Sequence, residues 1–518
     1  MPDASLSWET VRGLQRALAR GQISSVDLVR HSLDRIESVD RSGPSIKSVI
    51  ELNPEAEKIA SALDRERSDG SIRGDLHGMT VLIKDNIDTR DSMRSTAGSI
   101  AMLEARPRQD ADVVRRLREA GLVLLGKTNL SEWANFRSAR SISGWSARGG
   151  QSRNPYVLDR SPCGSSSGSA TAVAAGLVPL ALGTETDGSI LCPAAASGIV
   201  GIKPTVGRTS RAGVVPISAS QDTVGPFART VRDAAMLLAA ISGADPRDEA
   251  TSASAGRELG DLSVLLDDDG LRGARIGVPR KVMFGYSTHA DEVANQAIEV
   301  MRERGAIVID PADFPSADEL EKSEAELEVL LYEFKSGLNG YLAGLGGDAP
   351  RSLEEVIEFN KTHADLEMPY FKQETFEKAQ GKGPLTEPAY LEALATNRRL
   401  GRTEGIDAVM KEHELILELI GQNRILQIDA LVMPTGGPAF LIDPVNGDSH
   451  SGASSTIAAI AGYPGITVPA GMAHGLPIGI TFMGPAWSEP VLIRLAHAYE
   501  RASLAWRPPE FRPSAVTF

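Results

Sequence analysis

Apolar residues recur along this chain at two spacings, one typical of helices and one typical of strands. Near the N-terminus, Ser24 followed by Asp27 has the form of a helix-capping pair. The positions after Ser24 are apolar at intervals of three and four: Val26, Val29, Leu33 and Ile36. This spacing predicts an amphipathic helix with one buried face.

Short apolar runs predict buried strands between such helices. Residues 79–83 are largely apolar and end at Lys84, which places this lysine at the end of a strand. A second amphipathic pattern begins at Val113 and stops at Gly121, and residues 122–125 then have the apolar character of a strand.

The same alternation continues in the second half of the chain. Residues 274–279 and 306–309 are strand-like and flank a helical pattern at 291–304, an arrangement typical of a crossover unit. Residues 429–434 form another apolar run. Alternating strands and helices predict an α/β protein whose sheet carries helices on both faces.

One stretch departs from this alternation. Residues 316–422 are rich in Glu, Leu, Lys and Ala, and they predict several helices interrupted by loops at 337–350 and 381–388. We expect a helical insertion that lines the substrate cleft. A peripheral decoration of the domain is the alternative that the sequence leaves open.

Charge and composition exclude several classes of protein. The formal net charge of −14 disfavours nucleic acid as a partner. The most apolar segment, residues 172–182, is too short to cross a bilayer and contains Pro179, so we expect no membrane partner. No charged region followed by an apolar stretch opens the sequence, so we expect no secretory signal and a cytoplasmic location.

Cysteines and histidines offer no obvious metal site. Cys163 and Cys192 are the only cysteines, so we expect neither a disulfide framework nor a cysteine-based zinc site. We expect both to be small apolar side chains rather than catalytic thiols. The eight histidines are scattered, and His77 is expected to make a structural hydrogen bond. We therefore predict no metal and no cofactor.

The lysine at the strand end is a candidate catalytic base. Amide hydrolysis requires an activated nucleophile, an oxyanion site and a proton for the leaving nitrogen. Lysine can activate a serine only when neutral, and its free pKa of about 10.4 means that burial must lower the pKa. Taken alone, Lys84 fits a surface side chain that reaches solvent better than a catalytic base, because lysines with a perturbed pKa are uncommon.

A serine-rich loop, SPCGSSSGS, occupies residues 161–169. Residues 164–168 formally fit the G-x-S-x-G turn, which would make Ser166 a nucleophile. That turn needs a strand leading into it, and Pro155 and Pro162 interrupt the preceding segment, so we exclude it. A P-loop is excluded because no lysine follows the glycines at the required spacing. A flexible linker is disfavoured because a short helix of small residues follows directly.

This loop, a second loop at residues 183–190 (GTETDGSI) and Lys84 resemble the amidase signature family. Its members usually carry S-P-G-G-S-S-G-G-S and G-T-D-x-G-G-S-I at these places. The match continues in register through residues 193–195, 198–201, 203–205, 220–226 and 462–469. The resemblance covers most of the chain and implies a single domain, 1–518, built on a large twisted mixed β-sheet flanked by helices on both faces.

The resemblance also implies the roles of individual residues. It makes Ser189 the nucleophile that forms an acyl-enzyme, Ser165 a bridging serine after a cis peptide bond, and Lys84 the terminal base. The oxyanion site would be formed by four backbone N–H groups: Thr186, Asp187, Gly188 and Ser189.

Several positions depart from the usual family pattern: Cys163, Ser167, Glu185, Asp187 and Leu191. The bacterial peptide amidases of this family have a similar pattern at these positions. Residues 330–335 and 484–490 also resemble the corresponding segments of those enzymes. Asp187 would act through its amide with its carboxylate turned aside, because a carboxylate facing the oxyanion would oppose catalysis.

The expected function is hydrolysis of a small-molecule or peptide amide, with the C-terminal amide of peptides as the favoured substrate. A broad amidase for aryl or aliphatic amides, or an amidotransferase subunit, are alternatives. A non-catalytic binding module is disfavoured because all three catalytic positions are kept.

Overall fold

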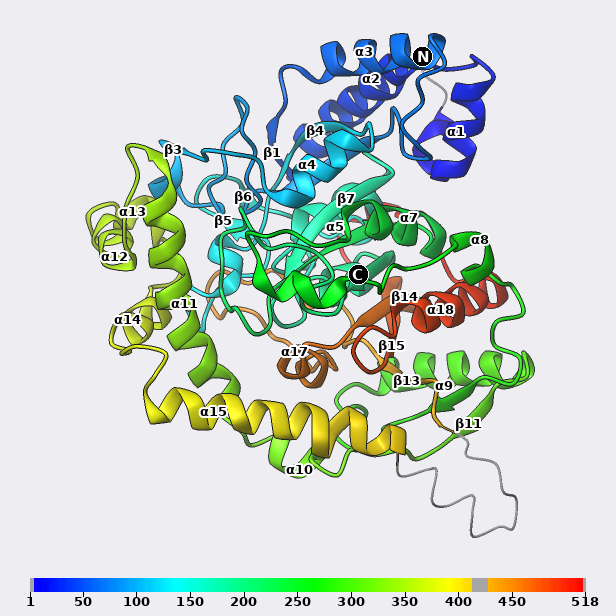
Figure 1. The fold of residues 1–518 in the computed structure, drawn as a ribbon, viewed down its shortest axis with the longest axis vertical. Coiled ribbons are helices and arrows are strands. Elements are labelled where there is room, and N and C mark those ends of the chain that lie inside the picture. Colours follow the sequence, from blue (N-terminus) through cyan, green and yellow to red (C-terminus); the bar gives the residue numbers. More distant parts are fainter. Residues whose placement is uncertain (1–3, 412–426, 516–518) are drawn as a thin grey trace.

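The predicted strands assemble into one central sheet in the computed structural model, which describes residues 4–411 and 427–515. The sheet has 11 strands (Figure 1). In spatial order they are β1 (Val49–Leu52), β4 (Val123–Thr128), β2 (Thr80–Lys84), β7 (Leu180–Glu185), β9 (Thr223–Ala228), β8 (Val200–Lys203), β14 (Gly465–Ala473), β15 (Leu476–Met483), β13 (Ala430–Pro434), β10 (Arg275–Gly277) and β11 (Ile307–Ile309). Two-stranded pairs outside it are β3 (Ala105–Arg106) with β12 (Gly346–Gly347), and β5 (Trp145–Ser146) with β6 (Gly150–Gln151).

The sheet is mixed, as predicted. Strand β2 pairs in parallel with both β4 and β7, and β10 pairs in parallel with both β11 and β13. The strands between these two groups pair antiparallel, and β14 and β15 form a long antiparallel ladder. The parallel order around β2 matters for function because it places the ends of β2 and β7 side by side.

Helices cover both faces of the sheet (Figure 1). Successive side chains of a strand point to opposite faces. On β2, Val81 and Ile83 therefore join a core with helices α1, α4, α7, α9 and α18, whereas Leu82 joins a core with α2, α3, α5 and α6. These helices are α1 (Val11–Ala19), α2 (Ser25–Arg35), α3 (Ala56–Ser68), α4 (Asp112–Glu119), α5 (Ser167–Ala174), α6 (Leu191–Ala196), α7 (Val231–Ile241), α9 (Thr288–Glu303) and α18 (Glu489–Ser503). Shorter elements are α8 (Leu262–Leu265) and α17 (Thr456–Ala461).

The local sequence signals are confirmed where they are strongest. Helix α2 begins with the predicted capping box, in which Ser24 and Asp27 bond each other's backbone N–H. Strands β10 and β11 are parallel neighbours joined by α9, which confirms the crossover unit. Strand β2 ends at Lys84, as the apolar run predicts.

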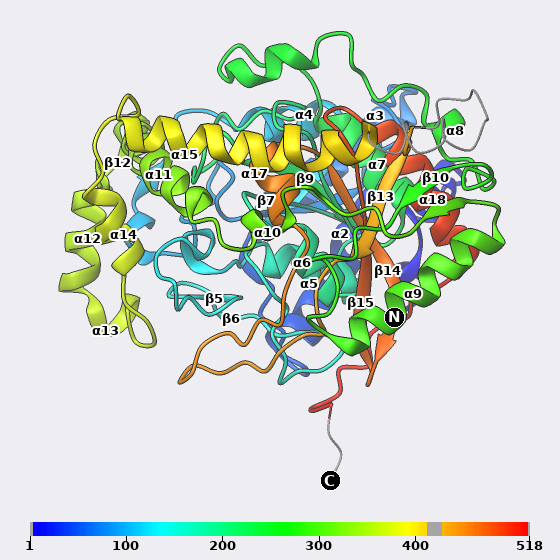
Figure 2. The ribbon, with the colours of Figure 1, turned by 90° about the horizontal axis from the view of Figure 1, so that it is seen from below.

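The helical stretch wraps around one side of the molecule (Figures 1 and 2). It contains α10 (Ala317–Leu320), α11 (Ala325–Gly344), α12 (Leu353–Thr362), α13 (Ala364–Glu367), α14 (Glu374–Gln380) and α15 (Pro388–Arg398), which continues into a π-helical turn at Arg399–Ile406. The part of the predicted insertion at residues 412–422 lies outside the described residues.

The loop predicted at 337–350 is wrong over its first half, because α11 runs on to Gly344. Leu338 and Leu342 are fully buried at a four-residue spacing, and this packing outweighs the cost of about 1 kcal/mol that each helical glycine adds relative to alanine. Gly337 lies against Pro216, where a side chain would have little room.

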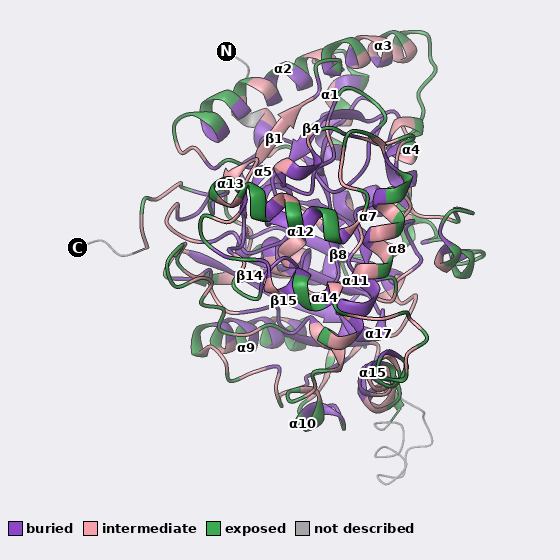
Figure 3. Ribbon diagram, turned by 90° about the vertical axis from the view of Figure 1, so that its left-hand side faces the viewer, coloured by how far each residue is buried: buried purple, intermediate pink, exposed green. Residues whose placement is uncertain are grey.

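Burial follows the layers of the fold (Figure 3). The central strands of the sheet are almost wholly buried, whereas the edge strands β1 and β11 are partly exposed and outer helices such as α12 expose one face. Among the described residues, no helix combines the length and the apolar character needed to cross a bilayer.

Candidate active site

The side chain of Lys84 projects from the end of β2 and is fully buried. Its Nζ lies 2.8 Å from Ser165 Oγ and 2.8 Å from Thr184 Oγ1, and 3.3 Å from the Thr184 carbonyl oxygen. Thr184 is on β7, the parallel neighbour of β2, so the sheet itself brings lysine and threonine together.

The three partners of the amine are all neutral oxygens. They are the Ser165 hydroxyl, the Thr184 hydroxyl and the Thr184 carbonyl. Asn86 also donates to Thr184 Oγ1, over 3.0 Å, and fixes that hydroxyl as an acceptor. Burial lowers the pKa of Lys84 to about 7, although Asp222 and Glu185 act in the opposite direction.

The Ser165 loop is held rigidly under the surface. Ser165 is fully buried, and its carbonyl accepts a hydrogen bond of 3.0 Å from the Ser131 N–H. The peptide bond between Gly164 and Ser165 is cis. Ser166, the residue of the excluded G-x-S-x-G turn, donates its hydroxyl to the Thr184 carbonyl over 3.0 Å and directly precedes α5 as its N-cap residue.

The Ser189 loop connects β7 to α6, and Ser189 is 9% exposed. The Glu185 carboxylate accepts the N–H groups of Ile190 and Leu191 at 2.7 and 2.9 Å. No backbone acceptor within the described residues engages the N–H groups of residues 186–189, so they are available to an oxyanion. Gly188 has φ +73°, a conformation that favours glycine.

The two loops are joined twice. The Ser166 N–H donates to the Ser189 carbonyl over 3.2 Å, and Cys163 forms a disulfide with Cys192. The expectation that the cysteines are separate apolar side chains is therefore wrong. A spacing of 29 residues gives no local signal for pairing, and the tertiary fold brings the two cysteines together. His450 lies beside them, but the joined sulfurs do not offer a thiolate metal site.

The structure brings Lys84 and Ser165 into direct contact and places Ser189 on the adjoining loop. In the described part of the chain, no hydrogen bond joins the hydroxyls of Ser165 and Ser189. Thr184, Asn86 and Glu185 complete the surroundings of Lys84 and of the Ser189 loop, and the sequence pattern predicted no contact for any of them.

The family model described as "Amidase" matches residues 27–493. The chain belongs to the amidase signature family. Together with the lysine and serine geometry, the match confirms the prediction that the chain is an amidase, a hydrolase of amide bonds.

Three relatives indicate where this amidase lies within the family. The structure of native peptide amidase from Stenotrophomonas maltophilia is 49% identical, with a TM-score of 0.89 over 98% of this chain and 99% of that chain. A probable amidase of Arabidopsis thaliana is 42% identical over 98% of this chain and 92% of its own length. A glutamyl-tRNA(Gln) amidotransferase subunit from Chloroflexus aurantiacus is 34% identical over 95% of this chain and 96% of its own length.

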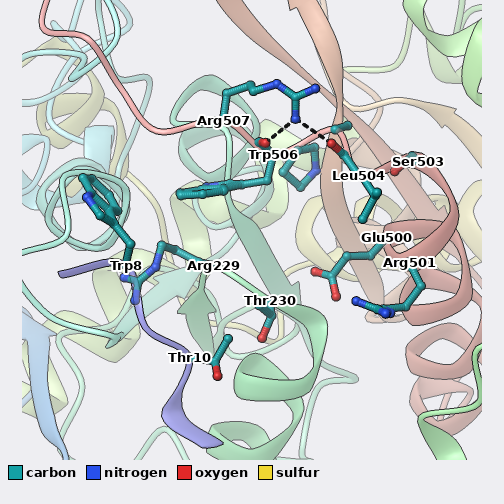
Figure 4. Close-up of a pocket in the computed structure, with 12 residues that line it drawn as sticks. Trp8, Thr10, Arg229, Thr230, Glu500, Arg501, Ser503, Leu504, Trp506 and Arg507 are labelled. Carbon is teal, nitrogen blue, oxygen red and sulfur yellow. Dashed lines mark hydrogen bonds between the residues drawn. The ribbon is translucent and has the colours of Figure 1, made fainter. Parts of the chain in front are cut away.

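Other features of the amidase lie away from this site. His77 bonds the Leu63 carbonyl over 2.9 Å, which confirms its structural role. A pocket of about 360 Å³ lies between the N-terminal segment and the end of α18 (Figure 4). Trp8 and Trp506 line it, and the Arg229 guanidinium there is bound to three backbone carbonyls. None of the candidate catalytic residues lines this pocket.

Proposed function

We propose that this amidase hydrolyses carboxamides through an acyl-enzyme on Ser189, with Ser165 and Lys84 as its proton relay. The observation that carries the proposal is the 2.8 Å contact between the buried Lys84 Nζ and Ser165 Oγ. A lysine with a pKa near 7 is substantially neutral at physiological pH and can accept a proton from that serine.

The proposed reaction has two halves. The Ser189 hydroxyl attacks the amide carbonyl carbon and passes its proton to Ser165, whose own proton moves to Lys84. The N–H groups of residues 186–189 stabilise the oxyanion. The proton then returns along the same path to the leaving nitrogen, the C–N bond breaks, and water hydrolyses the ester. This relay requires the hydroxyls of Ser165 and Ser189 to meet within hydrogen-bonding distance when substrate is bound.

The favoured substrate is the C-terminal amide of peptides. The support is similarity: 49% identity to a peptide amidase, compared with 34% to an amidotransferase subunit. Purified chain assayed on a peptide amide and on an anilide separates this proposal from a broad aryl or aliphatic amidase. An amidotransferase subunit would instead require partner chains and glutamine.

The deciding experiment is to trap the acyl adduct with an amide-mimicking inhibitor and to locate it by mass spectrometry. We expect the adduct on Ser189. An adduct on Ser165, Ser166 or another residue would contradict the assigned nucleophile.

We further infer that residues 1–518 form one amidase domain and that the 316–422 insertion lines the substrate cleft. Support comes from Glu326 of α11, which accepts a hydrogen bond from Gln221 beside the nucleophile loop. A cytoplasmic location stays a prediction from the sequence. The Cys163–Cys192 disulfide argues against it, because disulfides are rare in reducing compartments.

A further inference from the structure

Helix α11 carries two glutamates, Glu326 and Glu333, that face the residues around the nucleophile loop. They are seven positions apart and so lie on one side of the helix. Glu333 accepts the Ser220 N–H over 3.0 Å and the Tyr390 hydroxyl over 2.7 Å. Glu326 Oε1 accepts Gln221 Nε2 over 2.8 Å. Through these contacts α11 is bonded to the loop that precedes β9.

That loop is bonded in turn to the nucleophile loop. Gln221 Nε2 also lies 3.4 Å from the Thr186 carbonyl, and the Thr186 hydroxyl donates to Asp222 Oδ1 over 2.6 Å. Thr186 opens the run of four N–H groups that the proposed mechanism uses. The position of those groups therefore depends on contacts with the insertion.

Asp187, the next residue, makes the closest link to α11. Its Oδ2 accepts the Thr456 hydroxyl over 2.7 Å, whereas its buried Oδ1 has no conventional donor within the described residues. The Glu326 carboxyl lies within hydrogen-bonding reach of Asp187. Two ionised carboxylates cannot share a hydrogen bond, so a hydrogen bond between Glu326 and Asp187 requires a proton on one of the two.

The proton belongs on Glu326. Burial and the neighbouring Asp187 raise the pKa of Glu326 well above its usual range, because both disfavour a second negative charge. With Glu326 Oε1 occupied by Gln221, a proton on the other oxygen supplies the donor that Asp187 Oδ1 otherwise lacks.

We propose that Glu326 is a positioning residue for the oxyanion site: its neutral carboxyl donates a hydrogen bond to Asp187 and so holds the nucleophile loop in place. This inference rests on the proposed acyl-enzyme mechanism. Loss of the proton would put two negative charges in contact beside the developing oxyanion, so catalysis should fail at alkaline pH.

Lys203 and His450 act electrostatically on Asp187, but neither is among the groups that act on Glu326. Asp187 and Gln221 face Glu326 itself. On the elements packed against α11, Tyr390 is bonded to Glu333, and Lys382 is paired with Glu328 at 2.6 Å. Glu328 thus provides a matched control on the same helix.

The test compares three variants in a peptide-amide assay across pH. Glu326→Leu removes the donor, and we expect kcat to fall roughly tenfold to a hundredfold with KM little changed, as for a slightly misplaced catalytic group. Glu326→Gln keeps an N–H donor toward Asp187 and an acceptor for Gln221. We expect it to retain kcat at neutral pH and to lose the alkaline decline of the wild type. Glu328→Gln should match the wild type throughout.

The inference would be overturned if Glu326→Leu kept the kcat of the wild type. It would also be overturned if Glu326→Gln lost activity at alkaline pH as the wild type does. An infrared difference spectrum between wild type and Glu326→Gln at neutral pH should show the carbonyl stretch of a protonated carboxyl. This signal does not depend on turnover, and its absence would also overturn the inference. A wild type that shows the signal but cleaves no amide would instead refute the proposed function.

Discussion

Lys84 Nζ and Ser165 Oγ lie 2.8 Å apart although 81 residues separate them in the chain. The contact forms because β2 ends beside β7, and the serine loop packs against the same strand ends. Burial among neutral oxygens lowers the pKa of this lysine toward neutrality, although the carboxylates of Asp222 and Glu185 act in the opposite direction.

Replacing the nucleophile should stop the reaction. We expect Ser189→Ala to form no acyl adduct and to lose measurable turnover, because no other hydroxyl is assigned to attack the carbonyl. Mass spectrometry after inhibitor treatment and a peptide-amide assay measure the two effects. Ser252→Ala, an exposed serine, is the control and should behave as the wild type. Turnover in Ser189→Ala at the wild-type rate would move the nucleophile elsewhere.

Removing the base should slow the reaction without unfolding the protein. We expect Lys84→Ala to lower kcat by about 10²- to 10⁴-fold, the usual contribution of a general base. Lys127 is equally buried but bonds the Ile87 carbonyl and Ser95 instead of the catalytic loops. Lys127→Met should therefore keep the kcat of the wild type when the rate is divided by the concentration of folded protein. Thermal melting measures the folded fraction. Near-normal rates in Lys84→Ala would refute the base assignment.

Below neutral pH, the dependence of kcat/KM on pH should reflect the protonation of Lys84. Only the neutral amine accepts a proton, so kcat/KM should fall tenfold per pH unit below a pKa of about 7. Above that pKa it should rise to a maximum, until the alkaline decline expected from Glu326 begins. Steady-state assays from pH 5 to pH 9 provide the measurement. An optimum near pH 5 would mean that the protonated lysine is the active form, contrary to the mechanism.

The disulfide should support both stability and activity. Replacing Cys163 and Cys192 together by serine should cost about 2 to 4 kcal/mol of unfolding free energy, because the bond closes a loop of 29 residues. Turnover should also fall, since the bond joins the loops that carry Ser165 and Ser189, the residues of the proposed proton relay. Denaturant titration and the peptide-amide assay measure the effects. A dithiol reductant should reproduce them in the wild type and should leave the double variant unchanged.

The positive φ of Gly188 should be required for activity. A side chain there costs about 1 to 2 kcal/mol in the left-handed region, and its Cβ would approach Ser455 Oγ to 2.9 Å. We expect Gly188→Ala to lower kcat/KM by shifting the neighbouring N–H groups. Gly285 has φ +88° but open space around it, so Gly285→Ala should lose stability and keep kcat/KM. Equal kinetic losses in both variants would exclude a specific role for Gly188.

Local elements and family membership could be predicted before the fold was known. The capping box of α2, the strand that ends at Lys84 and the α9 crossover follow from apolar spacing and from interactions within a few residues. The two serine-containing loops are contiguous motifs, which can be recognised without knowing what they contact. The glycines of α11 show where such local signals fail. They predicted a loop from residue 337, but the helix continues because Leu338 and Leu342 are buried.

Contacts between distant segments arise only when the chain folds. The pairing of Cys163 with Cys192, the acceptors that Thr184 offers to Lys84, and the approach of Glu326 to Asp187 all join separate parts of the chain. The spacing of apolar residues in the sequence does not indicate such contacts, since they depend on strand order and on how the helical stretch wraps around the sheet. The pKa of Lys84 is set in the same way, because desolvation is a property of the folded surroundings rather than of the residue.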